Sequence, residues 1–467
     1  MSGQLAGLLL YSAGLIAFGV WIGRRVDSSG GFFVADRKLG GFLLFCTILA
    51  ANIGAGSTVG AAGLGYRDGL SAWWWVGSAG IGTIVLALWV GPRIWRVASD
   101  NGLLTVGDFL EHRYGRGVRA MIAILLWLGT LAILAGQLIA MAEILQVVAG
   151  APRWVGALIG GLVMTAYFSA GGLVASAWVN MVQLVVLVVG FAVAVPWALG
   201  AAGGWDAVVS AAPAVDGYLS LGQGGQSGWI YLALLGPAFI VSPGLLQKVY
   251  GAVDQRAIRT GLLAAGVALM IFAFAPALLG MVARTIDPSL VQHEQALPLV
   301  LTQGLPPILG LLGLAAVFSA EISSADAILF MLSTSLSKDL YKRFVRPDAT
   351  DRDVLRVARW AAVAGGVLGV GLALVLPSVI GSLTIFYSLL SVSLFVPVVA
   401  GLYTRRPGVA EAFAAIGAGL LALLVARLID TTEASRLFDP TLVGIVVSAI
   451  AFALVSLIRR SGEKEAG

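Results

Sequence analysis

The sequence predicts an all-α polytopic membrane protein with thirteen transmembrane helices, and three observations carry this prediction. Apolar residues make up 59% of the 467 residues and charged residues only 11%, far below the roughly 25% charge of a soluble domain. Apolar stretches recur from one end of the chain to the other, and most reach the length of about 20 residues that a bilayer requires. The basic residues gather in alternate loops between these stretches. We therefore expect residues 1–467 to form a single transmembrane domain.

Reading for apolar runs between polar breaks gives the thirteen expected helices. They cover residues 5–23, 41–62, 70–91, 118–147, 154–170, 175–199, 229–246, 260–282, 308–335, 360–377, 380–403, 409–426 and 441–458. No Lys or Arg precedes the first run, so we interpret it as a retained helix, because a cleaved signal peptide begins with a basic segment. Trp73, Trp74 and Trp75 open the third run and are interpreted as interfacial aromatic residues.

The distribution of basic residues predicts the orientation. With an outer N-terminus, the segments that would lie inside hold 24 of the 29 Lys and Arg residues, and the outer segments hold the other 5. Cytoplasmic loops of membrane proteins carry such an excess. We therefore expect a multi-pass protein of the bacterial cytoplasmic membrane with its C-terminus inside. The net charge of +5 is assigned to this topology, and no nucleic-acid partner is expected.

Two of the expected helices contain helix breakers near mid-membrane. The second run carries Gly54, Gly56 and Gly60, and the seventh carries Pro237 within Leu235–Gly244. The two runs lie five apart, so they cross the membrane in opposite directions. Paired interruptions are typical of inverted-repeat transporters, whose binding sites lie near the bilayer midplane. The alternative is that the glycines only allow close helix packing and the proline only kinks its helix.

This spacing divides the chain into parts. Residues 41–200 form the first predicted inverted repeat and residues 229–403 the second. Residues 1–40 contribute a peripheral helix and the first inner loop, and residues 404–467 contribute two peripheral helices and a short inner tail. The unwound backbone of each interrupted helix would offer free carbonyl groups to a cation.

The ninth run contains polar residues at membrane depth. Ala320, Ser323 and Ser324 share one face of a helix, so two hydroxyl groups and one carbonyl group can face the interrupted second run. Such a cage of oxygens suits sodium, a hard cation. The alternative is that both hydroxyl groups bond to their own helix.

Glu321 and Asp326 lie in the same run, where ionisable groups usually mark an ion path or face a partner. No Lys or Arg lies within any expected span to pair with them. We therefore expect each to be protonated, to bind a cation, or to sit nearer the surface than the run suggests.

Several short motifs occur in order along most of the first eleven runs. They are Phe32–Gly40, Phe109–Gly115, Gly171-Gly172 followed by Asn180-x-x-Gln183, Ser323-Ser324, and Lys338-Asp339-Leu340-Tyr341-Lys342. In this order they resemble the motifs of the solute:sodium symporter family. The resemblance implies a LeuT-like fold with a five-plus-five helix core. It also implies a sodium site made by Ala50, Ile53, Ala320, Ser323 and Ser324.

Two positions depart from the family pattern. Many members have Asp where this chain has Asn180, and a small polar residue where it has Asp326. The resemblance therefore makes Asn180 and Asp326 candidates for a second cation or proton site, and Glu321 is added to them as an ionisable residue at membrane depth. Sugar-transporting members place an aromatic gate where this chain has Gly244, so a sugar is not the expected solute.

The sequence thus predicts a sodium-coupled secondary symporter that imports a small polar organic solute by alternating access. No catalytic motif supports an enzyme, and a monomer in the lipid bilayer is expected to suffice for transport. A proton-coupled permease of the same fold is one alternative, and a transport-like sensor or channel module is another. The candidate solute-lining residues are Asn52, Ser57, Gln137, Phe239, Ser242 and Tyr387.

Overall fold

The computed structural model describes residues 3–23, 37–168, 172–404, 408–429 and 439–465, and this part of the chain is almost entirely helical. In the first half the elements are α1 (Gly3–Gly23), α3 (Gly41–Asn52), η2 (Ala55–Ser57), α4 (Val59–Asp68), η3 (Gly69–Ala72), α5 (Trp73–Val85), η4 (Leu86–Val90), α6 (Gly91–Asp100), α7 (Val106–Tyr114), α8 (Arg116–Ala149), α9 (Arg153–Phe168), α10 (Gly172–Ala201) and α11 (Trp205–Ser210). A short hairpin of β1 (Gln223–Gly224) and β2 (Ser227–Gly228) follows.

The second half continues the helical pattern after the hairpin. Its elements are α12 (Tyr231–Val241), α13 (Pro243–Tyr250), α14 (Gln255–Phe272), α15 (Phe274–Ile286), η5 (His293–Gln295), α16 (Ala296–Gln303), α17 (Pro307–Thr334), η6 (Ser335–Val345), α18 (Asp351–Val375), α19 (Val379–Tyr403), α20 (Val409–Ile429) and α21 (Pro440–Glu465). The predicted all-α membrane architecture is therefore confirmed for the described residues.

By length and composition, ten of the described helices can cross a membrane. The difference from the expected thirteen lies in the first half of the chain. Ala55–Asp100 is a single continuous element although it turns at Gly69, whose φ of +77° favours glycine. Three more apolar stretches accompany these ten, namely Ala6–Leu15 within α1, Gly41–Asn52, and Arg153–Thr165 within α9. The number thirteen stays a prediction.

The helix breakers of the second run interrupt it as predicted. The α-helical backbone of α3 ends at Asn52, and Ile53 and Gly54 are extended before η2 and α4 resume the helix. A Cβ atom on Gly54 would lie 2.3 Å from Ser324 Oγ, so only glycine allows α3 and α17 to approach this closely.

The seventh run breaks between α12 and α13 at Ser242, whose ψ of 121° is not helical. Pro243 follows, and a residue that precedes proline is disfavoured in the helical region. Pro237, by contrast, lies inside the continuous helix α12. The break therefore comes from the Ser-Pro pair.

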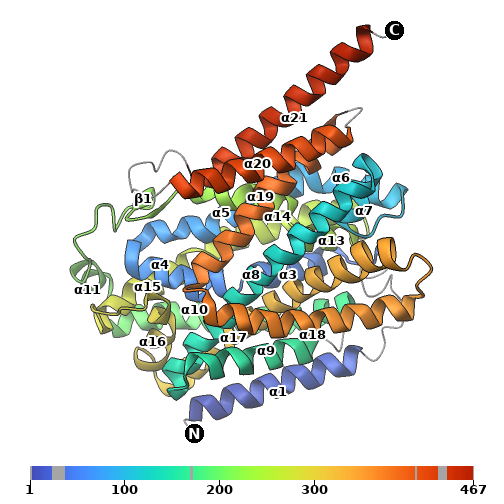
Figure 1. Cartoon of the computed structure of the whole chain (residues 1–467). Coiled ribbons are helices and arrows are strands. Elements are labelled where there is room, and N and C mark those ends of the chain that lie inside the picture. Colours follow the sequence, from blue (N-terminus) through green and yellow to red (C-terminus); the bar gives the residue numbers. More distant parts are fainter. Residues whose placement is uncertain (1–2, 24–36, 169–171, 405–407, 430–438, 466–467) are drawn as a thin grey trace.

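The core of the bundle surrounds these two interruptions. The long helix α17 packs against α3, α8 and α10, and α19 packs against α8 and α12. Figure 1 shows α1 and the α20–α21 pair on opposite sides of this core, with the C-terminal end of α21 projecting away from it. The interruptions therefore lie among helices from both halves of the chain.

One helix begins earlier than the hydropathy predicts. The expected run starts at residue 360, but α18 begins at Asp351 after a capping box in which Thr350 and Asp353 satisfy each other's backbone amides. Its first turns are charged, so an average of hydropathy leaves them out although the cap favours a helix there.

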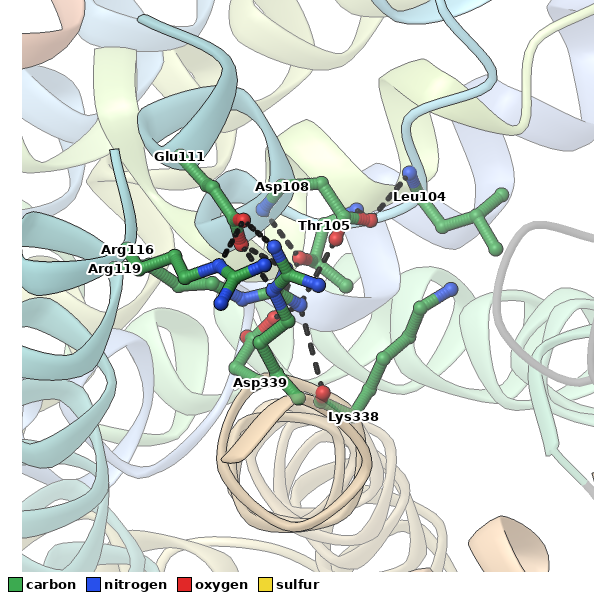
Figure 2. Close-up of polar contacts among 9 residues, drawn as sticks. Leu104, Thr105, Asp108, Glu111, Arg116, Arg119, Lys338 and Asp339 are labelled. Atoms are coloured by element: carbon green, nitrogen blue, oxygen red, sulfur yellow. Dashed lines mark hydrogen bonds and ion pairs between the residues drawn. The ribbon is translucent and has the colours of Figure 1, made fainter. Parts of the chain in front are cut away.

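Figure 2 shows a cluster of charged residues that joins α7, α8 and η6. Arg119 on α8 lies 2.9 Å from Asp108, 2.8 Å from Glu111 and 2.7 Å from Asp339. Arg343 also pairs with Glu111. Burial alone would raise the pKa of Glu111, but hydrogen bonds from Arg343 and Arg119 and their charges hold that pKa below its usual value. We call these five residues the α7 charge cluster.

Candidate functional site

The two serines of α17 bond to the interrupted end of α3. Ser323 Oγ lies 2.8 Å from the carbonyl oxygen of Ala50 and 3.0 Å from that of Ala320, and its single proton can be donated to either. Ser324 Oγ lies 3.0 Å from the carbonyl oxygen of Ile53. The structure thus brings together all five residues that the resemblance implied for a sodium site.

A further oxygen at this point was not predicted. The carbonyl oxygen of Ala51 also lies 3.0 Å from Ser324 Oγ. These carbonyl groups are available because α3 ends at Asn52, and the last carbonyls of a helix have no partner within it. The resulting group contains only neutral hydroxyl and carbonyl oxygens, which fit a hard monovalent cation by the oxygen preference of such ions. We call the oxygens of Ala50, Ala51, Ile53, Ala320, Ser323 and Ser324 the oxygen cage.

Glu321 lies on α17 within one helical turn of Ser323 and Ser324, and it is fully buried. Its Oε1 accepts a hydrogen bond of 2.9 Å from Thr58 Oγ1, at the start of α4. Its Oε2 has no hydrogen-bond partner among the described residues. Glu321 therefore links α17 to the far side of the interruption and sits at depth in the bundle.

Asn180 and Asp326 lie on α10 and α17. Asn180 is fully buried, and its Nδ2 lies 3.4 Å from Thr47 Oγ1 on α3. Asp326 is 6% exposed and interacts electrostatically with Lys248. Whether Asn180, Asp326 and Glu321 form a second ion site stays a prediction.

The expectation that no basic residue lies at depth beside the acidic residues is wrong. The expected seventh span ends at residue 246, which places Lys248 in a loop, but α13 continues to Tyr250. Lys248 occupies the last turn of α13 and is only 3% exposed. Hydropathy did not predict the buried position of Lys248, because a lysine ends an apolar run in the sequence whether it lies in a loop or on the buried face of a helix.

A cavity opens beside the oxygen cage. The cage residues Ser324 and Ala51 line it, as does Gly54. All six candidate solute-lining residues also line it, namely Asn52, Ser57, Gln137, Phe239, Ser242 and Tyr387. The sequence did not predict the contributions of Lys248, Met331 and Phe386.

One part of the cavity wall is polar and lies at the break between α3 and α4. Gln137 Oε1 accepts a hydrogen bond of 2.9 Å from the backbone amide of Ala55, which fixes the start of η2. Ser57 Oγ donates to the carbonyl oxygen of Asn52 at 2.8 Å. Asn52 Nδ2 is buried and has no hydrogen-bond partner among the described residues.

Another part of the wall is aromatic. The ring of Tyr387 lies 5.4 Å from that of Phe239 and 5.3 Å from that of Phe386, between centroids. Trp75 meets Tyr387 edge-on at 6.2 Å and is only 3% exposed. The interpretation of Trp75 as an interfacial residue is therefore wrong. Three adjacent tryptophans at the start of a run suggest an aromatic belt, but the sequence does not show which of them point into the protein.

An acidic residue outside the membrane spans caps the helix that carries Tyr387. Glu294 in η5 accepts hydrogen bonds from the backbone amides of Val379 at 2.6 Å and Ile380 at 3.4 Å, at the start of α19. Burial raises the pKa of the Glu294 carboxyl to about 7, although these two hydrogen bonds act to lower it. The start of α19 is thus held by a group that titrates near neutral pH.

The sequence profile described as "Sodium:solute symporter family" matches residues 32–419. The chain belongs to this family. It is 28% identical to the sodium/pantothenate symporter of Escherichia coli (strain K12), over 94% of this chain and 93% of that protein. It is 24% identical to the high-affinity choline transporter 1 of Caenorhabditis elegans, over 90% of this chain and 77% of that protein. The protein is therefore a multi-pass membrane transporter, not an enzyme, and sodium is its coupling ion.

The fold agrees with this membership. A solved structure of a Na⁺-coupled sialic acid symporter, in a substrate-bound outward-open state, matches with a TM-score of 0.80. The match covers 97% of both chains at 17% sequence identity. This likeness confirms the LeuT-like fold that the sequence motifs implied.

Proposed function

We propose that this member of the family is a sodium-coupled symporter that imports a small polar organic solute by alternating access. The observation that supports this most is the meeting of Ser323 and Ser324 with the carbonyl groups of α3 beside a cavity. In this proposal the oxygen cage holds the sodium ion, and the cavity holds the solute.

Sodium binding in the oxygen cage would be coupled to solute binding in the cavity, because the same two helices form parts of both. The ion would hold α17 against the interrupted end of α3, and Ser324 and Gly54 belong to both the cage region and the cavity wall. An ion that fixes one arrangement of these two helices increases the affinity for a solute that needs the same arrangement. The solute in turn strengthens sodium binding by the same factor.

The solute would use both walls of the cavity. Asn52, Ser57 and Gln137 would bond its polar groups, and Phe239 and Tyr387 would pack on its apolar part, with Ser242 at the second interruption. The relatives named above carry pantothenate and choline, two unlike molecules, so membership of the family leaves the solute open.

Alternating access requires one end of the pathway to open as the other closes. We assign the α7 charge cluster to the closed inner end, in the topology with an outer N-terminus and an inner C-terminus that the distribution of basic residues favours. Residues 41–200 and 229–403 would form the two inverted repeats that rock against each other. A monomer in the bilayer would contain the whole pathway.

The proton-coupled alternative is not retained, because sodium is the coupling ion of the family. A second cation site at Asn180, Asp326 and Glu321 stays a prediction. Lys248 already supplies a positive charge beside Asp326, so Asp326 does not need a second ion to balance its charge.

The test of this function is the unfolding temperature of the purified protein in NaCl and in KCl at equal ionic strength. A ligand that binds only the folded state raises that temperature in a saturable way. We expect saturable stabilisation by NaCl and none by KCl. Equal responses to the two salts would contradict sodium coupling through a folded-state site.

A further inference from the structure

We infer that the transported solute is a small organic anion whose carboxylate is bound by the ammonium group of Lys248. This inference rests on the proposed symport function and adds the chemical class of the solute. It is carried by the placement of one lysine and by the charges around the cavity.

Lys248 is buried, lines the cavity, and has unused hydrogen-bonding capacity. Its side chain is 3% exposed. Among the described residues, its ammonium group makes no hydrogen bond and no ion pair within 4.0 Å. The negative charge of Asp326 adds an electrostatic attraction to it. An ammonium group has three donors, and a buried charge needs hydrogen-bonding partners as well as a distant counter-charge. A solute carboxylate in the cavity would accept these bonds.

The charges around the cavity favour an anion once sodium is present. The oxygen cage contains no carboxylate, so sodium brings a positive charge that its own ligands do not balance. Lys248 and Asp326 balance each other. Glu321 does not line the cavity, and its Oε1 faces Thr58 on α4. A solute with one negative charge would balance the sodium ion.

This arrangement would also explain coupling in electrostatic terms. Opposite charges held a few ångströms apart in a medium of low dielectric constant attract strongly. Sodium in the cage would therefore raise the affinity for the anion, and the anion would raise the affinity for sodium. A cationic solute would instead add a second positive charge next to sodium that no group of the cage balances.

The remaining walls define the rest of the solute. Asn52 lines the cavity, and its Nδ2 has no hydrogen-bond partner among the described residues, so we expect a hydroxyl or carbonyl oxygen elsewhere on the solute. The rings of Phe239, Phe386 and Tyr387 favour a short apolar segment. The expected class is thus a small carboxylate with a further polar oxygen and a few apolar carbons.

Matched pairs of compounds test this inference in the same unfolding assay. The probes are pantothenate, lactate and N-acetylglycine, each beside its uncharged counterpart: pantothenyl alcohol, lactamide and N-acetylglycinamide. We expect at least one carboxylate to raise the unfolding temperature in NaCl but not in KCl, with no effect of its counterpart. Uncharged counterparts that stabilise equally, or a sodium-responsive protein that no carboxylate stabilises, would overturn the inference.

Variants of Lys248 complete the test. Lys248→Met should weaken the response to the carboxylate by about tenfold or more, the loss expected for a charge-assisted hydrogen bond, and Lys248→Arg should restore most of it. The double variant Lys248→Met/Asp326→Asn removes both charges together, so it controls for destabilisation by an unbalanced Asp326. Unchanged carboxylate affinity in the double variant would also overturn the inference. A protein that sodium fails to stabilise at all would instead refute the proposed function.

Discussion

Replacing Ser323 and Ser324 with alanine removes two of the oxygens that would bind sodium. In the folded protein each hydroxyl group donates to carbonyl oxygens at 2.8–3.0 Å. A hydrogen bond between neutral groups contributes about 1 kcal/mol net, so the double variant should lose about 2 kcal/mol and remain folded. An interaction with a charged group contributes about 1.5–3 kcal/mol. Since about 1.4 kcal/mol corresponds to tenfold, each lost oxygen should weaken sodium binding tenfold or more.

The assay is the unfolding temperature measured over a series of NaCl concentrations, with KCl keeping the ionic strength constant. We expect the half-maximal sodium concentration to rise at least tenfold for each single variant and further for the double variant. Ser333→Ala is the matched control, because Ser333 lies on α17, is fully buried and, among the residues that the structure describes, bonds only to Phe330 of its own helix. A double variant with the sodium dependence of the wild type would refute the cage. An equal change in Ser333→Ala would show that the effect is not specific.

Three further predictions follow from single contacts. Since the pKa of Glu294 rises from 4.5 to about 7 on folding, its contribution to stability is complete below pH 4.5 and is lost as the pH rises to about 7. The loss is about 3 kcal/mol. Glu294→Gln should reduce the pH dependence of the unfolding temperature between pH 4.5 and 7. An unchanged pH dependence in this variant would contradict the assignment. Gly54→Ala would place a Cβ atom 2.3 Å from Ser324 Oγ. We therefore expect a folded protein that sodium stabilises with at least tenfold lower affinity. Normal sodium dependence would show that the close approach of Gly54 to Ser324 is not required. Arg119→Met leaves the α7 charge cluster with unbalanced acidic groups and should cost about 3–5 kcal/mol of stability. Adding Asp339→Asn should recover part of this loss, as measured by thermal unfolding. A double variant no more stable than the single one would count against this explanation.

The interrupted helices and the serines of the oxygen cage could be predicted because the sequence marks them locally. Gly54 stands among other glycines in an apolar run, and Ser242 precedes Pro243, so the backbone preferences of these residues are visible without the fold. Ser323 and Ser324 are polar residues at membrane depth, where any hydroxyl group needs a partner. The structure places these hydroxyl groups on the carbonyl groups of α3.

The positions of Lys248 and Trp75 could not be predicted from the sequence, because burial depends on which face of a helix meets the bundle. Lys248 lies two residues beyond an apolar run, where a lysine is usually interfacial, and only the extension of α13 buries it. Trp75 follows two other tryptophans, and the packing of α5 against α12 places its ring against Tyr387. The start of α18 was missed for a related reason, since its first turns are stabilised by a cap and not by apolar residues.

Equilibrium binding of radioactive sodium to the purified protein tests the central claim most directly, because it requires no knowledge of the solute. The wild type and Ser333→Ala should both bind sodium saturably, and excess unlabelled NaCl should displace it while KCl does not. The Ser323→Ala/Ser324→Ala variant should bind one sodium ion fewer per chain than the wild type. Equal sodium binding by the double variant and the wild type would contradict the assignment of the oxygen cage as the coupling site.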